Sequence, residues 1–128
     1  MDRNPAMPVM AQTMMQLGFI PQAPPGDDGT GPSGMASMSD PAKVRAVLTD
    51  AGFTDITIEE VEVPFHFRGF DELWKFPTEL AGPIGQVIKR MDDADRTRVK
   101  DAITAATEPF LEGGEYRFPA VAVCFIAR

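Results

Sequence analysis

The stretch Ser39-Asp40-Pro41-Ala42-Lys43-Val44-Arg45-Ala46-Val47-Leu48-Thr49-Asp50-Ala51-Gly52-Phe53 carries the signals of a complete helix that leads into a strand. Asp40 is a good N-cap acceptor, Pro41 suits the first helical position, where no amide donor is needed, and Gly52 can adopt the left-handed conformation at the end. Apolar residues between these two ends recur at helical spacing, so one face packs and the other faces water. We predict a helix over 41–51 that covers a sheet.

Two further stretches are predicted strands. In 55–63 the alternation of apolar residues changes parity halfway, so we expect a β-bulge or a kink near Glu59 and Glu60, with pairing ending soon after, at Pro64. The closing stretch Val121-Ala122-Val123-Cys124-Phe125-Ile126-Ala127-Arg128 is apolar on both faces. We expect it to lie in a strand over 119–127 that is buried on both sides, with layers above and below and neighbours on both edges.

The remaining helices are predicted from the same apolar spacing. A short helix is expected within 5–19, and two longer ones over 78–91 and 94–107. We also expect a helical turn at 70–74 that stops at Pro77, and a chain reversal at Glu112-Gly113-Gly114-Glu115. The predicted fold class is α/β, or α+β for the chain taken alone, with three to four helices around an antiparallel strand pair. The predicted segments are an N-terminal helix in 1–20, a flexible loop rich in proline and glycine in 21–39, and a subdomain over 40–128.

Composition excludes several classes of function. The chain has 128 residues, a size that favours one domain, and a formal charge of −7 with no basic run interleaved with aromatic residues, so we expect no nucleic-acid partner. A single cysteine, Cys124, permits neither a disulfide framework nor a thiolate metal cluster within one chain, and we expect no metal site. Because no stretch reaches 18 apolar residues and no signal peptide begins the chain, we expect a cytoplasmic protein without a membrane span.

The order of these segments resembles a known enzyme family. The helix over 40–53, the strand over 55–63, the aromatic segment 65–74 and the closing strand over 120–128 are similar to the C-terminal portion of class I S-adenosylmethionine-dependent methyltransferases. The ubiquinone and menaquinone biosynthesis group, called type 11, is the most similar. The resemblance covers about residues 5–128 and rests on order and composition.

The resemblance implies a Rossmann-like sheet that ends in an antiparallel strand slotted between its neighbours. It also implies S-adenosylmethionine as cofactor, held by a glycine-rich loop and an acidic residue that lie upstream of everything matched here. Gly26, Gly29, Gly31 and Gly34 follow no strand, so they do not form that loop and are interpreted as part of a flexible segment. We therefore expect no residue of this chain to bind the cofactor. Catalysis would require a cofactor-binding half supplied from elsewhere.

His66 is the weak candidate for a catalytic residue. It is the only histidine, and it lies where methyltransferases of this group line the acceptor pocket, so a general base is one interpretation. A packed or surface histidine without a role in catalysis is the favoured one, because the sequence indicates no partner carboxylate.

Aromatic residues are the candidates for substrate binding. Phe67, Phe70 and Trp74, together with His66, could line a pocket for an apolar or aromatic methyl acceptor, although ordinary core packing explains them equally well. The methionines near the N-terminus could form an adaptable lid, but an amphipathic helix packed on the fold is favoured. These are Met7, Met10, Met14 and Met15. Cys124 is expected to be a small buried hydrophobe.

Together these features predict the substrate-side, sheet-completing part of a methyltransferase-like protein, a truncated form that is inactive alone. The alternative is a non-catalytic small-molecule-binding or dimerisation module derived from that fold. The open neighbours of the closing strand predict a homo-oligomer or a partner chain that completes the sheet.

Overall fold

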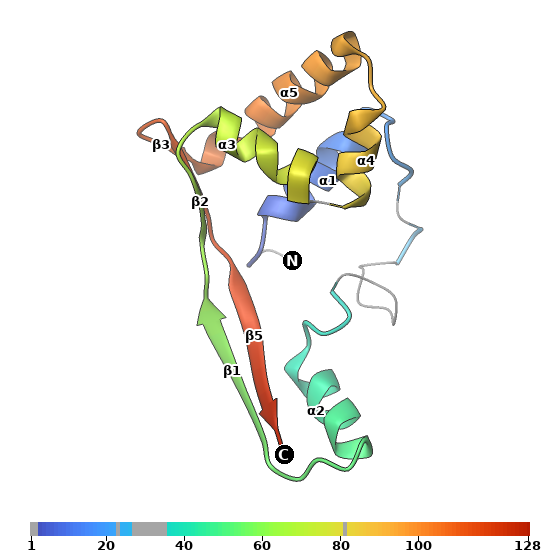
Figure 1. Cartoon of the computed structure of the whole chain (residues 1–128), viewed down its shortest axis with the longest axis vertical. Helices are drawn as coiled ribbons and strands as arrows, with labels where there is room; N and C mark the ends of the chain where they lie inside the picture. The colour runs from blue at the N-terminus through green and yellow to red at the C-terminus, as the bar shows by residue number, and fades with distance from the viewer. Residues whose placement is uncertain (1–2, 23, 27–35, 81) are drawn as a thin grey trace. The chain divides into compact units, whose positions relative to one another are not determined.

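A computed structural model of the chain describes residues 3–22, 24–26, 36–80 and 82–128. The described residues form a mixed α/β fold with five α-helices and two small antiparallel sheets (Figure 1). Contacts divide the chain into two compact units. The larger unit comprises Met1–Gln22 and Pro64–Ala120, and the smaller unit comprises Ala23–Val63 and Val121–Arg128. Of the predicted loop over 21–39, residues 23 and 27–35, which include Gly29, Gly31 and Gly34, lie outside the described residues.

The smaller unit contains the helix predicted at its start. Helix α2 spans Pro41–Asp50, and the Asp40 side chain accepts a hydrogen bond of 2.9 Å from the Ala42 amide. Gly52 follows the helix with a φ of +96°, the left-handed conformation expected of a glycine at this position. The helix packs against strand β1, and its Val44 is fully buried. The predicted cover helix is therefore confirmed.

The sheet of the smaller unit is one antiparallel pair. Strand β1 spans Ile56–Glu62 and pairs with strand β5, Val121–Ala127, from Ile56 opposite Ala127 to Glu62 opposite Val121. The predicted antiparallel pair is confirmed, but the predicted bulge near Glu59 and Glu60 is wrong, because every residue of β1 has one partner in an unbroken register. The change of parity has another consequence: Val61 stays in the ladder and is exposed on the face opposite Ile56 and Ile58.

The sequence predicted that strand β5 is buried on both sides, but the structure shows that it is not. Its second half is exposed, with Phe125 at 40% and Ile126 at 64% of their full accessible area, and Cys124 is exposed too. The predictions of a buried strand and of a buried cysteine are therefore wrong for the chain described here. The physical reason is that such a strand needs covering layers, and α2 and β1 are the elements that the described residues of the smaller unit form beside it.

The larger unit has a closed hydrophobic core. Helix α1, Ala6–Gln16, contributes Met10 and Met14, which are both fully buried. These two side chains are core residues, so the structure supports the amphipathic-helix interpretation rather than a methionine lid. The other elements are α3 (Phe70–Lys75), a π-helical turn (Phe76–Leu80), α4 (Pro83–Lys89), α5 (Asp93–Thr107), a 3-10 turn (Glu108–Phe110), β2 (Phe65–Phe67), β3 (Leu111–Glu112) and β4 (Glu115–Phe118).

Pro77 does not stop the chain from continuing as a helix, in contrast to the prediction. Helix α3 passes into the π-helical turn, which contains Pro77. A proline cannot donate to the preceding turn and its ring crowds that turn's carbonyl, so the wider π-helical geometry accommodates it. The Thr78 hydroxyl donates to the carbonyls of Trp74 at 2.9 Å and Lys75 at 3.2 Å, which satisfies acceptors near the proline. The predicted helix over 78–91 is consequently shorter and is seen as α4.

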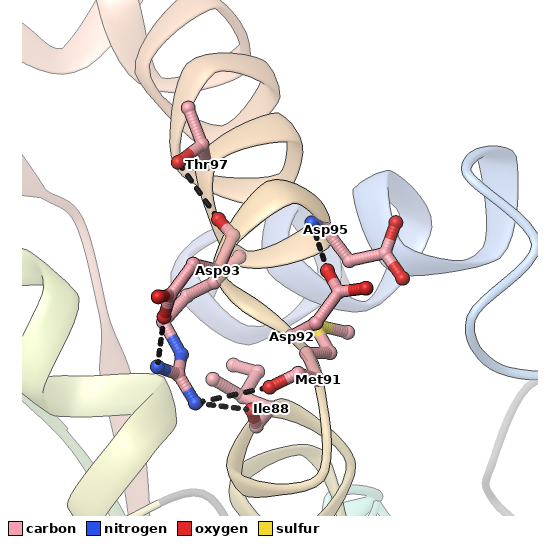
Figure 2. A network of polar contacts seen from close by, with 7 residues as sticks. Ile88, Met91, Asp92, Asp93, Asp95 and Thr97 are labelled. Atoms are coloured by element: carbon pink, nitrogen blue, oxygen red, sulfur yellow. Dashed lines mark hydrogen bonds and ion pairs between the residues drawn. The ribbon is translucent and has the colours of Figure 1, made fainter.

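Arg96 joins the end of α4 to the start of α5. Its guanidinium donates to the carbonyl oxygens of Ile88 and Met91 at 3.4 and 3.3 Å and pairs with Asp93 at 3.4 Å (Figure 2). The Asp92 side chain caps α5 by accepting from the Asp95 amide at 2.8 Å. Since the last carbonyls of a helix lack intrahelical partners, this cation stabilises the end of α4 while fixing the corner between the helices.

The sheet of the larger unit has the order β2-β4-β3 and is antiparallel throughout. Strands β3 and β4 form a tight hairpin, in which Glu112 lies opposite Glu115. Gly113 and Gly114 connect them with φ values of +60° and +82°, as a two-residue hairpin turn of the primed type requires. The predicted reversal is confirmed. The chain after this turn forms two strands, β4 and β5, which belong to different sheets and different units.

Candidate functional site

Strand β2 presents two chemically different faces. Successive side chains of a strand point to opposite sides, so Phe65 and Phe67 lie on one face and His66 on the other. Phe65 pairs with Phe118, and His66 lies opposite Arg117 on β4. The four predicted site residues are therefore not gathered around one pocket.

Phe67 belongs to the core of the larger unit. Its ring centroid lies 5.6 Å from that of Phe76 and 6.0 Å from that of Phe118, at tilted and edge-on angles. Phe118 is fully buried and stacks on Phe110 at 4.5 Å. Aromatic pairs at such distances and angles are typical of protein interiors. Phe67 therefore packs as a core residue.

Phe70 and Trp74 form a second aromatic pair on α3. Their ring centroids are 6.3 Å apart and their planes differ by 17°, and both residues are half-buried against the core. The Lys100 ammonium from α5 lies 5.2 Å from the Trp74 ring centroid, within the range of a cation–π interaction. This contact links α3 to α5.

An open depression of about 330 Å³ lies at the junction of β2 and α3. Its lining combines one aromatic ring with charged side chains of both signs: Arg68, Gly69, Phe70, Asp71 and Glu72. The Arg68 amide is held by the Glu72 carboxylate at 2.8 Å, which closes the turn between the strand and the helix. Of the predicted substrate-binding residues, Phe70 is the one that lines the depression.

His66 has the carboxylate partner that the sequence did not indicate. Its Nε2 lies 2.8 Å from Oε2 of Glu115, a residue on the neighbouring strand β4. Arg117 approaches the same oxygen at 3.4 Å. The hydrogen bond with His66, followed by the charge of the imidazolium, lowers the pKa of Glu115, while Arg117 and Arg68 add smaller effects in the same direction. The two residues are 49 positions apart, so only the strand pairing brings them together.

In this pair, the Glu115 carboxylate orients the His66 ring. When neutral His66 donates its Nε2 proton to Glu115, its Nδ1 carries the lone pair and can accept a proton from another molecule. The side chains are 43% and 39% exposed, respectively, so water competes for both. His66 does not line the depression beside Phe70. The geometry provides a proton acceptor, but not one aimed at a bound substrate.

No family model, curated protein or solved structure matches the chain. Among the described residues, no group of three or more histidine, cysteine, aspartate or glutamate side chains could hold a metal ion. No helix within the described ranges is long and apolar enough to cross a membrane.

The described residues do not fit S-adenosylmethionine. A dinucleotide-like cofactor turn requires a strand that leads through glycines into a helix. The turn Arg68-Gly69 is the nearest equivalent among the described residues, but β2 has three residues, α3 has six, and Asp71 and Glu72 place negative charge in the first helical turn.

Proposed function

We propose that this chain is the acceptor-side, sheet-completing part of a class I S-adenosylmethionine-dependent methyltransferase-like protein. The observation that carries the proposal is the order of elements in the smaller unit. A capped helix, α2, is followed by β1, and β1 pairs antiparallel with β5 from the far end of the chain. The segment between these two strands forms most of a separate unit with its own core.

The composition, pairing and exposure of β5 support the same proposal. The strand has no charged residue, no proline and no glycine, yet it has β1 as its one partner strand among the described residues, and its second half is exposed. Strands that are apolar on both faces normally lie inside sheets that are covered by helices on both sides. A strand of this composition is therefore suited to a larger sheet than the smaller unit contains.

In this proposal the larger unit contributes the acceptor side. Methyl transfer depends on holding acceptor and donor in line and on excluding water, and core-supported aromatic side chains suit both tasks. Phe70 and Trp74 are such side chains, and Phe70 lines the open depression. The acceptor would be an apolar or aromatic small molecule. His66, which the Glu115 carboxylate orients, would accept a proton only if the methyl acceptor extends to that face of β2.

A specific observation also favours a second function, that of a non-catalytic small-molecule-binding module. The larger unit has a closed core and an open depression of about 330 Å³, within the size range of small-molecule pockets. Both functions predict that menadione, an aromatic quinone, quenches the fluorescence of Trp74 saturably. Phe70→Ala should weaken this quenching, whereas Phe53→Ala, in the smaller unit, should leave it unchanged. Equal quenching of both variants would place the ligand elsewhere.

Cofactor binding separates the two functions. The methyltransferase proposal expects the reading frame upstream of Met1 to encode a glycine-rich strand–loop–helix segment. The product of that frame, expressed together with this chain, should bind S-adenosylmethionine in titration calorimetry, whereas this chain alone should not. Micromolar binding by this chain alone would contradict the proposal, and so would an upstream frame that encodes no such segment.

A further inference from the structure

The His66 ring uses one of its nitrogen atoms to bind Glu115. The hydrogen bond with His66 is the largest of the effects that lower the pKa of Glu115, so this carboxylate is ionised at neutral pH and can only accept a hydrogen bond. Nε2 of His66, which lies 2.8 Å from Oε2 of Glu115, must therefore carry the proton of the neutral ring. The lone pair is then on Nδ1. Because the side chain is exposed, this imidazole can act as a nucleophile as well as a base.

Two arginines lie near this histidine. Arg117 is its cross-strand partner on β4, and the Arg117 guanidinium lies 3.4 Å from the same carboxylate oxygen that His66 binds. Arg68 comes two residues after His66, and its charge is close enough to lower the pKa of Glu115 as well. A second carboxylate, Glu112, pairs with Glu115 from β3, one strand farther from β2. Two cations and one carboxylate therefore surround the imidazole.

We propose that Nδ1 of His66 accepts a phosphoryl group from a small phosphoramidate donor, so that His66 is a modification site. Guanidinium groups suit phosphoryl oxygens well, because they donate paired hydrogen bonds and keep their positive charge. Arg117 and Arg68 supply that charge beside the ring, as cationic clamps do in phosphoryl transfer. Glu115 is the positioning residue, since it holds the ring by Nε2 and leaves Nδ1 to react.

The transfer breaks one phosphorus–nitrogen bond and forms another. The lone pair of Nδ1 attacks phosphorus, and the electron pair of the donor's phosphorus–nitrogen bond leaves with the donor nitrogen. When the donor is phosphoramidate itself, this nitrogen is already protonated and leaves as ammonia. The imidazole becomes an imidazolium, which the carboxylate 2.8 Å from Nε2 stabilises. Because the product is again a phosphoramidate, the donor must carry a bond of the same kind, and a phosphate ester would release too little free energy.

This reaction does not rest on the proposed function, although both use His66. S-adenosylmethionine, the product of the upstream frame and a ligand in the depression beside Phe70 take no part in it. The two ideas can therefore fail separately, because calorimetry with the upstream product tests the first and phosphorylation of this chain alone tests the second.

The nitrogen that reacts with potassium phosphoramidate tests the orientation of the ring. In N-acetylhistidine the reaction should favour Nε2, which is farther from the backbone and less hindered. In the full chain it should occur at Nδ1, because Glu115 holds Nε2. Glu115→Ala frees Nε2 and should move the phosphoryl group to it. Phosphorus NMR and proton–nitrogen correlation spectra of the single histidine distinguish the products. Reaction of the wild type at Nε2, no reaction, or the same product from both chains would overturn the proposal.

The rate of the same reaction tests the role of the arginines. The wild type should react at least about tenfold faster than N-acetylhistidine, and Arg117→Gln should lose most of this advantage, because a positive charge beside the transferred group is removed. Arg98→Gln is the matched control, since Arg98 is an exposed arginine of α5 that pairs with Asp95. It should react as the wild type does. Circular dichroism verifies that each variant is folded. Equal rates for the wild type and Arg117→Gln, or for the wild type and N-acetylhistidine, would contradict the proposal.

Discussion

The two units of this chain differ in how completely they bury their apolar residues. The larger unit encloses side chains from α1, α3, α4, α5 and β4 in one core. In the smaller unit, Val44 is the one buried hydrophobic residue among those the structure describes. The same unit holds most of the exposed large hydrophobic side chains: Met38, Val47, Phe53, Val61, Val63, Phe125 and Ile126.

This difference shows that one sequence can enclose its apolar side chains in one region and leave them exposed in another. The larger unit satisfies its apolar surface from its own segments. The smaller unit has a well-capped helix and a regular strand pair, but a two-stranded sheet with one helix has too little apolar area to cover both faces. Its helix and strand pair are regular, and its described residues leave Phe125 and Ile126 exposed.

The largest expected effect is the loss of a core ring. Phe118→Ala removes a fully buried side chain that packs on Phe67 and Phe110, so the larger unit should lose about 3–5 kcal/mol of unfolding free energy. The control Phe53→Ala, in the smaller unit, should change the same transition by no more than about 0.5 kcal/mol. Urea unfolding followed by Trp74 fluorescence measures both. Similar losses in the two variants would break the distinction between the units.

A smaller effect is expected where α4 meets the π-helical turn. A Cβ atom added at Gly85 would lie 2.9 Å from the Thr78 carbonyl oxygen and 3.0 Å from that of Pro77, so Gly85→Ala must displace backbone. We expect a loss of about 1–3 kcal/mol by the same urea assay. Gly69→Ala is the matched control, since a Cβ there meets no atom within 4 Å. If both variants are equally stable, the packing of this corner is looser than described.

The smallest effect concerns the pair on the outer face of β2. His66→Ala removes the hydrogen bond and the charge that lower the pKa of Glu115, so this pKa should rise toward its ordinary value. Because the pKa is depressed in the folded state, the pair stabilises the fold above the ordinary pKa of a glutamate, and this contribution is lost as the pH falls through the lowered pKa. Carbon-detected NMR titration of the Glu115 carboxyl measures the shift. An unchanged pKa in His66→Ala would show that the pair does not persist in solution.

The sequence predicted the elements whose signals are local. Asp40, Pro41 and Gly52 mark the ends of α2 within a few residues, and Gly113-Gly114 marks the hairpin in the same way, so both features are confirmed. The pairing of β1 with β5 was also predicted, because both segments read as strands and the chain offers few others.

Features that depend on distant partners were not predicted. The pairing of His66 with Glu115 follows from the β2–β4 register, which no local pattern specifies. The change of parity in β1 suggested a bulge, but a strand with little covering either face has no buried side to protect, so the unbroken register carries little penalty. Similarly, the apolar composition of β5 predicted burial. Burial depends on the other segments that pack against the strand, and the sequence of β5 does not specify them.

Hydrogen exchange of the β5 amides, followed by NMR, tests most directly the central claim that β1 is the one strand among the described residues that pairs with β5. Arg128 and Asp55 exchange both of their backbone hydrogen bonds, and such pairs alternate along an antiparallel ladder. The amides of Ala122, Cys124 and Ile126 should therefore be protected by β1, while those of Val123 and Phe125 should exchange as in an unstructured peptide. Equal protection of all five amides would show that another part of the chain covers the outer edge, and would contradict the account.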